Sequence, residues 1–162
     1  MRRWAVMVRG ELIGSYVAPS EGEPMEAPAR PGSSRGSAST ATGTPRPPGK
    51  FSADQRGGRQ VTLIEHEAVE AAAHEGGIEL ADVDIRRNLV TLGVPLNHLV
   101  GCDFRVGDVV LRGQRLAEPC AYLEGLLGRE GVRKALIHRG GLRADIIAGG
   151  TITTGDEIEA LA

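Results

Sequence analysis

Between residue 59 and the C-terminus, short apolar segments alternate with glycine-containing turns, and this pattern restricts the possible folds more than any other feature. Most of these segments have the length and the flanking turn residues of strands. Strands and helices do not alternate regularly, which argues against a parallel sheet of the Rossmann type. We therefore predict an α+β domain, mainly an antiparallel β-barrel with a few peripheral helices. The predicted strands are residues 60–64, 88–92, 142–147 and 152–161, with a hairpin around Gly113.

Helices are expected where apolar residues recur at a spacing of three to four. The clearest case is residues 65–75, which Gly76 and Gly77 should end. Pro95 should open a short helical turn, whereas residues 80–85 should be extended. Two N-terminal strands, 4–8 and 11–17, should flank a turn or bulge at Arg9 and Gly10. The remaining predicted helices are residues 119–127 and 131–138.

Residues 19–58 differ sharply in composition from the rest of the chain. Seven of the nine prolines lie between Ala18 and Gly58, together with many Gly, Ser and Thr residues and few large apolar ones. Such a segment buries too little apolar surface to offset the entropy lost on ordering. We predict a single domain over residues 1–162, with 19–58 as a flexible loop within it.

The bulk composition argues against several classes of function. A net charge of −2 lacks the basic excess that nucleic-acid binding requires. No stretch approaches 18 apolar residues, so no membrane span is expected. The two cysteines, Cys102 and Cys120, have no zinc-ligand spacing and do not suggest a secreted disulfide framework. We expect a cytoplasmic protein whose thiols are reduced.

Cys120 is the strongest candidate for chemistry. It follows Pro119, a residue suited to the first turn of a helix, where free backbone N–H groups and the helix dipole favour a thiolate. Sulfur transfer, persulfide formation and molybdenum ligation all require a thiolate. The alternative is a buried, inert cysteine on a helix, and the residues alone leave both open. Cys102 has no comparable setting, and we interpret it as structural.

Two clusters of basic and amide side chains could bind an anion. Arg86, Arg87 and Asn88 enter a predicted strand and offer many hydrogen-bond donors. In residues 138–143, HRGGLR, glycines between basic residues allow backbone N–H groups to approach an anion. The simpler alternatives are a solvated strand start for the first cluster and an ordinary helix-ending turn for the second.

Other arrangements that support catalysis do not occur in the sequence, which has no Walker, GxGxxG or GxSxG motif. His66 and His74 lie near one face of a predicted helix without a nearby partner, and we interpret them as surface residues. The chain offers only Lys50 and Lys134 as Schiff-base lysines, so no intrinsic pyridoxal phosphate is expected.

Several stretches together resemble the MOSC family, named after the C-terminal domain of molybdenum cofactor sulfurase. They cover about residues 59–160, and SYVAPSEGEPM resembles the entry strand of the small stand-alone bacterial members. The elements RRNL, RVGDV, PC and GD are specific in combination. The matching stretches are QVTLIEHEAVEAA, IRRNLVTLGVPLNHLVG, FRVGDVVLRGQRLAEPC, HRGGLRADII and GGTITTGDEI.

The resemblance implies a β-barrel in which Cys120, from the PC element, carries a persulfide or ligates molybdenum. Arg86 and Asn88 match the family residues that help to hold the molybdenum pyranopterin. A pyridoxal-dependent cysteine desulfurase is the implied sulfur donor. The further candidates to hold an anionic cofactor or substrate are Arg115, Arg139 and Arg143.

The sequence departs from the family in two places. Ala117 stands where many members have a second cysteine, three residues before Cys120, so a two-thiol relay is not available. A Gly-Asp-basic-aromatic element that usually precedes the VTLI strand has no counterpart in residues 28–50.

The leading hypothesis is a MOSC-type protein that carries sulfur on Cys120 or binds molybdenum cofactor through it. One alternative is a complete molybdoenzyme that reduces N-hydroxylated compounds with a reductase partner. The other is a non-catalytic barrel that binds a partner through the Pro/Gly-rich loop.

Overall fold

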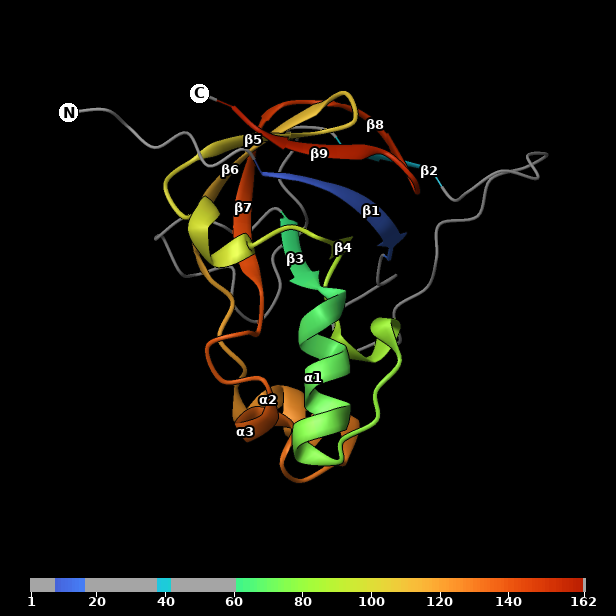
Figure 1. Ribbon diagram of the computed structural model, residues 1–162, viewed down its shortest axis with the longest axis vertical. Coiled ribbons are helices and arrows are strands. Elements are labelled where there is room, and N and C mark those ends of the chain that lie inside the picture. The colour runs from blue at the N-terminus through green and yellow to red at the C-terminus, as the bar shows by residue number, and fades with distance from the viewer. Residues whose placement is uncertain (1–7, 17–37, 42–60, 162) are drawn as a thin grey trace.

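The computed structural model describes residues 8–16, 38–41 and 61–161, and it contains a β-barrel with the helices gathered at one end (Figure 1). The barrel strands are β1 (Arg9–Ser15), β3 (Val61–Glu65), β4 (Leu89–Leu92), β5 (Asp103–Val106), β6 (Val109–Leu116), β7 (Leu142–Ala148) and β9 (Glu157–Ala160). The barrel closes in the order β1-β4-β3-β7-β6-β5-β9. All neighbouring pairs are antiparallel except β3 and β4, which are parallel. The predicted α+β, mainly antiparallel barrel is therefore confirmed.

The remaining elements lie around this barrel. The helices are α1 (His66–Gly76), α2 (Ala121–Leu127) and α3 (Val132–Ala135), with 3₁₀ turns at Asp82–Ile85 and Leu96–Leu99. A separate two-stranded sheet pairs β2 (Ala38–Ala41) with β8 (Gly150–Thr153). As predicted, α1 ends at a glycine: Gly77 has a left-handed φ of 64°. No helix in the described part of the chain is both long and apolar enough to cross a membrane.

Two apolar cores follow from the two faces of the barrel wall. Side chains alternate between the faces of a strand, so every second residue points into the barrel. In β3, for example, Leu63 belongs to the interior core and Ile64 to the core between the wall and the helices. The interior core also includes Phe104 and Leu142, which are both fully buried. The outer core contains buried side chains from all three helices, together with Leu136 directly after α3: Ala68, Val69, Ala72, Leu123 and Val132.

The hairpin predicted around Gly113 is wrong in position. The chain turns between β5 and β6, where Val106 pairs with Val109, and Gly113 lies inside β6. A Cβ at Gly113 would stand 2.1 Å from the carbonyl oxygen of Leu99. The glycine is therefore needed for a close approach between backbones, a requirement that local sequence patterns do not distinguish from a turn.

Other boundaries also differ from the predictions. Residues 80–85 contain a 3₁₀ turn instead of an extended segment, and the helix predicted at 131–138 is only Val132–Ala135. Arg9 and Gly10 are part of β1, whose irregularity falls between Leu12 and Gly14. Of the strand predicted at 4–8, only Val8 is described. Within the predicted loop at 19–58, residues 38–41 form a strand, and the other positions lie outside the described residues.

Candidate functional site

Cys120 lies where the chain leaves β6 and enters α2. Residues 117–120 belong to neither a helix nor a strand, and the Ala117 N–H donates to the Gly141 carbonyl at 2.8 Å. Pro119 is buried, whereas Cys120 is exposed and is the N-cap residue of α2, with an extended backbone. The prediction that Pro119 opens the helix is wrong. Pro119 packs against the residue 140 backbone, because a Cβ on Gly140 would lie 2.9 Å from its Cδ, and the helix begins two residues later.

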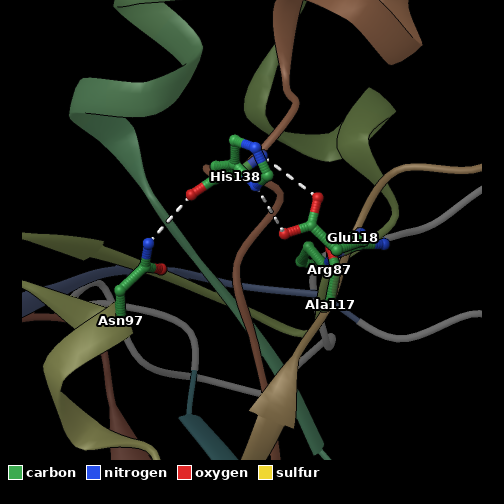
Figure 2. Close-up of polar contacts among 5 residues, drawn as sticks. All are labelled: Arg87, Asn97, Ala117, Glu118 and His138. Carbon is green, nitrogen blue, oxygen red and sulfur yellow. Dashed lines mark hydrogen bonds and ion pairs between the residues drawn. The ribbon is translucent and has the colours of Figure 1, made fainter.

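Residues 138–141 face this segment and are held to it by polar contacts (Figure 2). The His138 N–H donates to Glu118 Oε2 at 3.0 Å, and His138 Nδ1 lies 3.6 Å from Oε1 of the same carboxylate. Asn97 Nδ2 donates to the His138 carbonyl at 2.8 Å. These contacts join the segment before Cys120, the segment before β7 and the 3₁₀ turn at Leu96–Leu99.

Arg87 connects the same two segments from the protein interior. Its side chain is buried, and its Nε donates to the Gly140 carbonyl at 2.9 Å. Nη2 donates to the Ala117 carbonyl, also at 2.9 Å. Burial, and to a lesser extent the charge of Arg143, lowers the pKa of Arg87 to about 10, while Cys120 acts in the opposite direction. The guanidinium therefore lies against the segment that leads to Cys120.

A row of polar side chains crosses the outer face of the barrel at the same end. Arg115 of β6 pairs with Arg143 of β7, and Arg143 pairs in turn with Thr62 of β3. Thr62 meets Asn88, just before β4, through hydrogen bonds of 3.0–3.2 Å. Directly paired residues project from the same face, so the two guanidinium groups lie on one side of the wall. This row ends beside the segment that carries Cys120, because Leu116 pairs with Leu142.

Comparison with known protein families tests the resemblance found in the sequence. The family model of the MOSC domain matches residues 40–159, which is most of the chain. The protein belongs to the MOSC domain family. No curated protein matches the sequence.

Solved structures share the MOSC chain's fold at low sequence identity. The YUAD protein from Bacillus subtilis superposes with a TM-score of 0.70 at 15% identity, covering 96% of this chain and 97% of that one. YiiM from Geobacillus stearothermophilus gives 0.63 at 12% identity, over 96% and 74% of the two chains. YiiM from Escherichia coli gives 0.63 at 15% identity, over 95% and 70%. At these identities the likeness establishes the fold alone.

Among the residues that the MOSC resemblance singles out, Asn88 has clear structural contacts. Its Oδ1 accepts from the backbone N–H and the hydroxyl of Thr62, and its Nδ2 donates to the Tyr16 carbonyl at 3.3 Å. The side chain therefore joins the end of β1 to β3 and β4. Its role toward a cofactor stays a prediction.

Arg86 and Arg139 occupy different settings. Arg86 is half-buried and has a left-handed backbone, with φ of 58°. Arg139 Nη2 donates to Glu75 Oε2 at 2.5 Å, which holds the pKa of Glu75 below its ordinary value. Arg139 is thereby directed toward the end of α1, while Arg115 and Arg143 share the row described above. The roles predicted for all four arginines stay predictions.

Cys102 provides an internal comparison for Cys120. Both thiols are free and exposed, so exposure alone does not distinguish them. Cys102 Sγ lies 3.7 Å from the His98 carbonyl, at the opposite end of the polypeptide segment that forms β5 and β6. Cys120, in contrast, follows a segment whose Ala117 carbonyl accepts a hydrogen bond from the buried Arg87. The two cysteines therefore differ in the segments that carry them.

An open cleft of about 340 Å³ runs beside α2, but no predicted site residue lines it. Its lining residues are Ala121, Glu124, Gly125, Gly128, Arg129 and Glu130.

The sequence does not single out Arg87, which joins the two segments of the candidate site. It groups Arg87 with two adjacent donors, and the MOSC resemblance points to its neighbours Arg86 and Asn88. No local pattern identifies the partners of Arg87, because they lie 30 and 53 residues away in the sequence.

Proposed function

We propose that this MOSC protein carries sulfur on Cys120 as a persulfide. The observation that supports the proposal is the exposed Cys120 thiol, placed at a junction whose two segments share the buried guanidinium of Arg87. A nearby positive charge stabilises an anionic sulfur species. An exposed position also allows the sulfur of a donor protein to reach the thiol.

The chemistry needs no external oxidant if the incoming sulfur is already a persulfide. The Cys120 thiolate attacks the outer sulfur of a donor persulfide and forms a new S–S bond. The S–S bond of the donor breaks, and its electron pair leaves with the donor thiolate. Cys120 then holds one additional sulfur, and a pyridoxal-dependent cysteine desulfurase is the proposed donor.

A second candidate, binding of molybdenum cofactor, is favoured by the row of Arg115, Arg143 and Thr62 on the barrel wall. The donor chemistry fits this group: guanidinium forks bind phosphate, and a thiolate can ligate molybdenum. Cys120 would be the metal ligand, and Arg115 and Arg143 would hold the anionic part. When bound, the cofactor would supply redox chemistry at molybdenum.

The test of sulfur transfer compares the two exposed cysteines. The protein is incubated with a cysteine desulfurase and cysteine, and its intact mass is measured before and after treatment with a reductant. Wild type and Cys102→Ser should gain about one sulfur mass, which the reductant removes. Cys120→Ser should gain none, although its remaining thiol is exposed.

Two outcomes would count against the sulfur-carrier proposal. Equal sulfur gain on both cysteines would show that exposure, and not the setting of Cys120, controls the reaction. No gain on either would leave the cofactor candidate, which predicts molybdenum and pterin in protein purified from a host that makes the cofactor, and their loss in Cys120→Ser.

Further measurements separate the remaining alternatives. A complete molybdoenzyme would reduce N-hydroxylated compounds when supplied with a reductase. A protein that gains no sulfur and binds no pterin would be better described as a non-catalytic interaction module.

A further inference from the structure

Arg87 is the most buried charged side chain in the described part of the chain. It is 8% exposed, whereas its neighbours Arg86 and Asn88 are half-buried. Burying an ionised group in a protein costs free energy unless its donors or acceptors form hydrogen bonds and a nearby opposite charge compensates its own charge.

The hydrogen bonds of Arg87 go to backbone carbonyls. Nε and Nη2 donate to Gly140 and Ala117, both at 2.9 Å, and Nη1 lies 3.5 Å from the Ile85 carbonyl. No buried side-chain nitrogen or oxygen in the described residues lacks a partner. The Arg87 guanidinium therefore has hydrogen-bond acceptors. Because these carbonyl oxygens carry no net charge, they do not neutralise its positive charge.

The charge of Arg87 is balanced only in part. Burial lowers its pKa to about 10, which still leaves the guanidinium protonated at neutral pH. The charge of Arg143 repels it, and a thiolate at Cys120 would attract it. Each hydrogen-bond acceptor of Arg87 among the described residues is a neutral carbonyl, and one of them, Ala117, lies in the segment that leads to Cys120. The positive charge of Arg87 therefore lies beside this segment, and no hydrogen-bonded carboxylate neutralises it there.

A buried charge acts over a longer range than an exposed one, since less water and salt screen it. The exposed thiol of Cys120 is the point at which a molecule from solution would meet this field. Arg143, on the outer wall, adds a second positive charge nearby.

We propose that Arg87 determines the specificity of the Cys120 site by favouring anionic reaction partners over neutral ones. The proposal rests on the proposed function in that it takes Cys120 as the reacting group. It deepens that function by naming the partner class: a sulfur donor or cofactor with a negative charge beside the atom that meets Cys120. Arg87 acts through its field and through the two segments it connects, and it need not touch the partner.

The experiment compares two alkylating reagents of similar size and different charge. In a Cys102→Ser background only Cys120 can react, and its rate constants with iodoacetate (anionic) and iodoacetamide (neutral) are measured at one pH. Both reagents react with the thiolate, so the fraction of thiolate cancels from the ratio of the two rate constants. The ratio therefore reports the local potential, independently of any change in ionisation.

In the Cys102→Ser protein, this ratio should exceed that of a short cysteine peptide. Arg87→Met should lower the ratio by about three- to tenfold, the effect of removing one charge at moderate effective dielectric. Arg87→Lys should retain most of it, although Lys lacks the forked donor geometry. Arg105→Met, which removes an exposed arginine from β5, is the control for net charge and should leave the ratio unchanged.

An unchanged ratio in Arg87→Met would overturn the proposal, even if both rate constants changed together, because that result would indicate a purely structural role. If Arg87→Met does not fold, two other measurements test the proposal. A peptide-like ratio in the Cys102→Ser protein, or loss of the elevated ratio in a folded Arg87→Lys, would overturn it. Alkylation requires no persulfide, so an elevated ratio without sulfur gain would refute the proposed function and not the role of Arg87.

Discussion

Gly140 is the position at which a single methyl group should disturb the site most directly. A Cβ at this residue would stand 2.3 Å from the Ala117 carbonyl oxygen and 2.9 Å from Pro119 Cδ. Real Cβ contacts are essentially never below 3.0 Å, so Gly140→Ala must move the segment before Cys120 by about 0.7 Å or more. Unlike Gly141, Gly140 has no positive φ, and the effect is steric.

The expected loss of stability has two sources. Forcing extra volume into a packed region typically costs about 1–3 kcal/mol. The Ala117 and Gly140 carbonyls both accept from Arg87, so moving them apart also weakens hydrogen bonds to a buried cation, worth about 1.5–3 kcal/mol each when lost completely. Since the segment can relax in part, we expect Gly140→Ala to lower the free energy of unfolding by about 2–4 kcal/mol.

Urea denaturation followed by circular dichroism measures this change, with Gly125→Ala as the matched control. Gly125 lies within α2, and a Cβ there would meet nothing within 4 Å. Replacing a helical glycine with alanine stabilises by about 0.5–1 kcal/mol. If Gly140→Ala proves as stable as wild type while Gly125→Ala behaves as expected, the tight contact between the two segments does not exist in solution.

Two further predictions concern pH. Burial, reinforced by the charge of Glu67, raises the pKa of Glu65 above its ordinary 4.5. Folding therefore favours protonated Glu65, and the contribution of this form to the free energy of unfolding is lost as pH rises through the folded pKa. The stability of Glu65→Gln relative to wild type should therefore be greater at pH 7 than below pH 4, and equal differences would contradict the shift. The hydrogen bond from Arg139 lowers the pKa of Glu75, so that pair stabilises above pH 4.5 and less as pH falls through the lowered value. Glu75→Gln should be slightly less stable than wild type at pH 7, and this difference in stability should shrink in acid and in high salt. A difference that does not change with pH would exclude the ion pair as its cause.

The barrel and the position of the thiol could be predicted because their signals are local. Glycine turns, short apolar segments and the capping glycine of α1 each depend on a few neighbouring residues. The PC element likewise singles out Cys120 by its immediate context, and the reactive role of this thiol stays a prediction. Predictions of this kind agreed with the structure to within a few residues, as for α1 and β7.

The contacts that organise the site could not be predicted in the same way. The sequence predicts a turn at Gly113, because it does not show that the Leu99 backbone passes beside this residue. The sequence likewise places Arg139 among the anion-binding candidates, but its partner Glu75 lies 64 residues away. In each case the decisive neighbour comes from a distant part of the chain, and only the closed barrel brings it into contact.

Backbone strain occurs on both sides of the hydrogen bond between Arg87 and Gly140. The described residues include only two non-glycine positions with positive φ, Arg86 at 58° and His138 at 61°. Such a conformation costs on the order of 1 kcal/mol for an ordinary residue and persists only where surrounding contacts enforce it. Arg86 directly precedes Arg87, and His138 lies two residues before Gly140, the acceptor of the Arg87 Nε–H. The two strained residues thus flank the two ends of one buried hydrogen bond, which is the arrangement expected if the fold is constrained to hold a cation beneath the Cys120 segment.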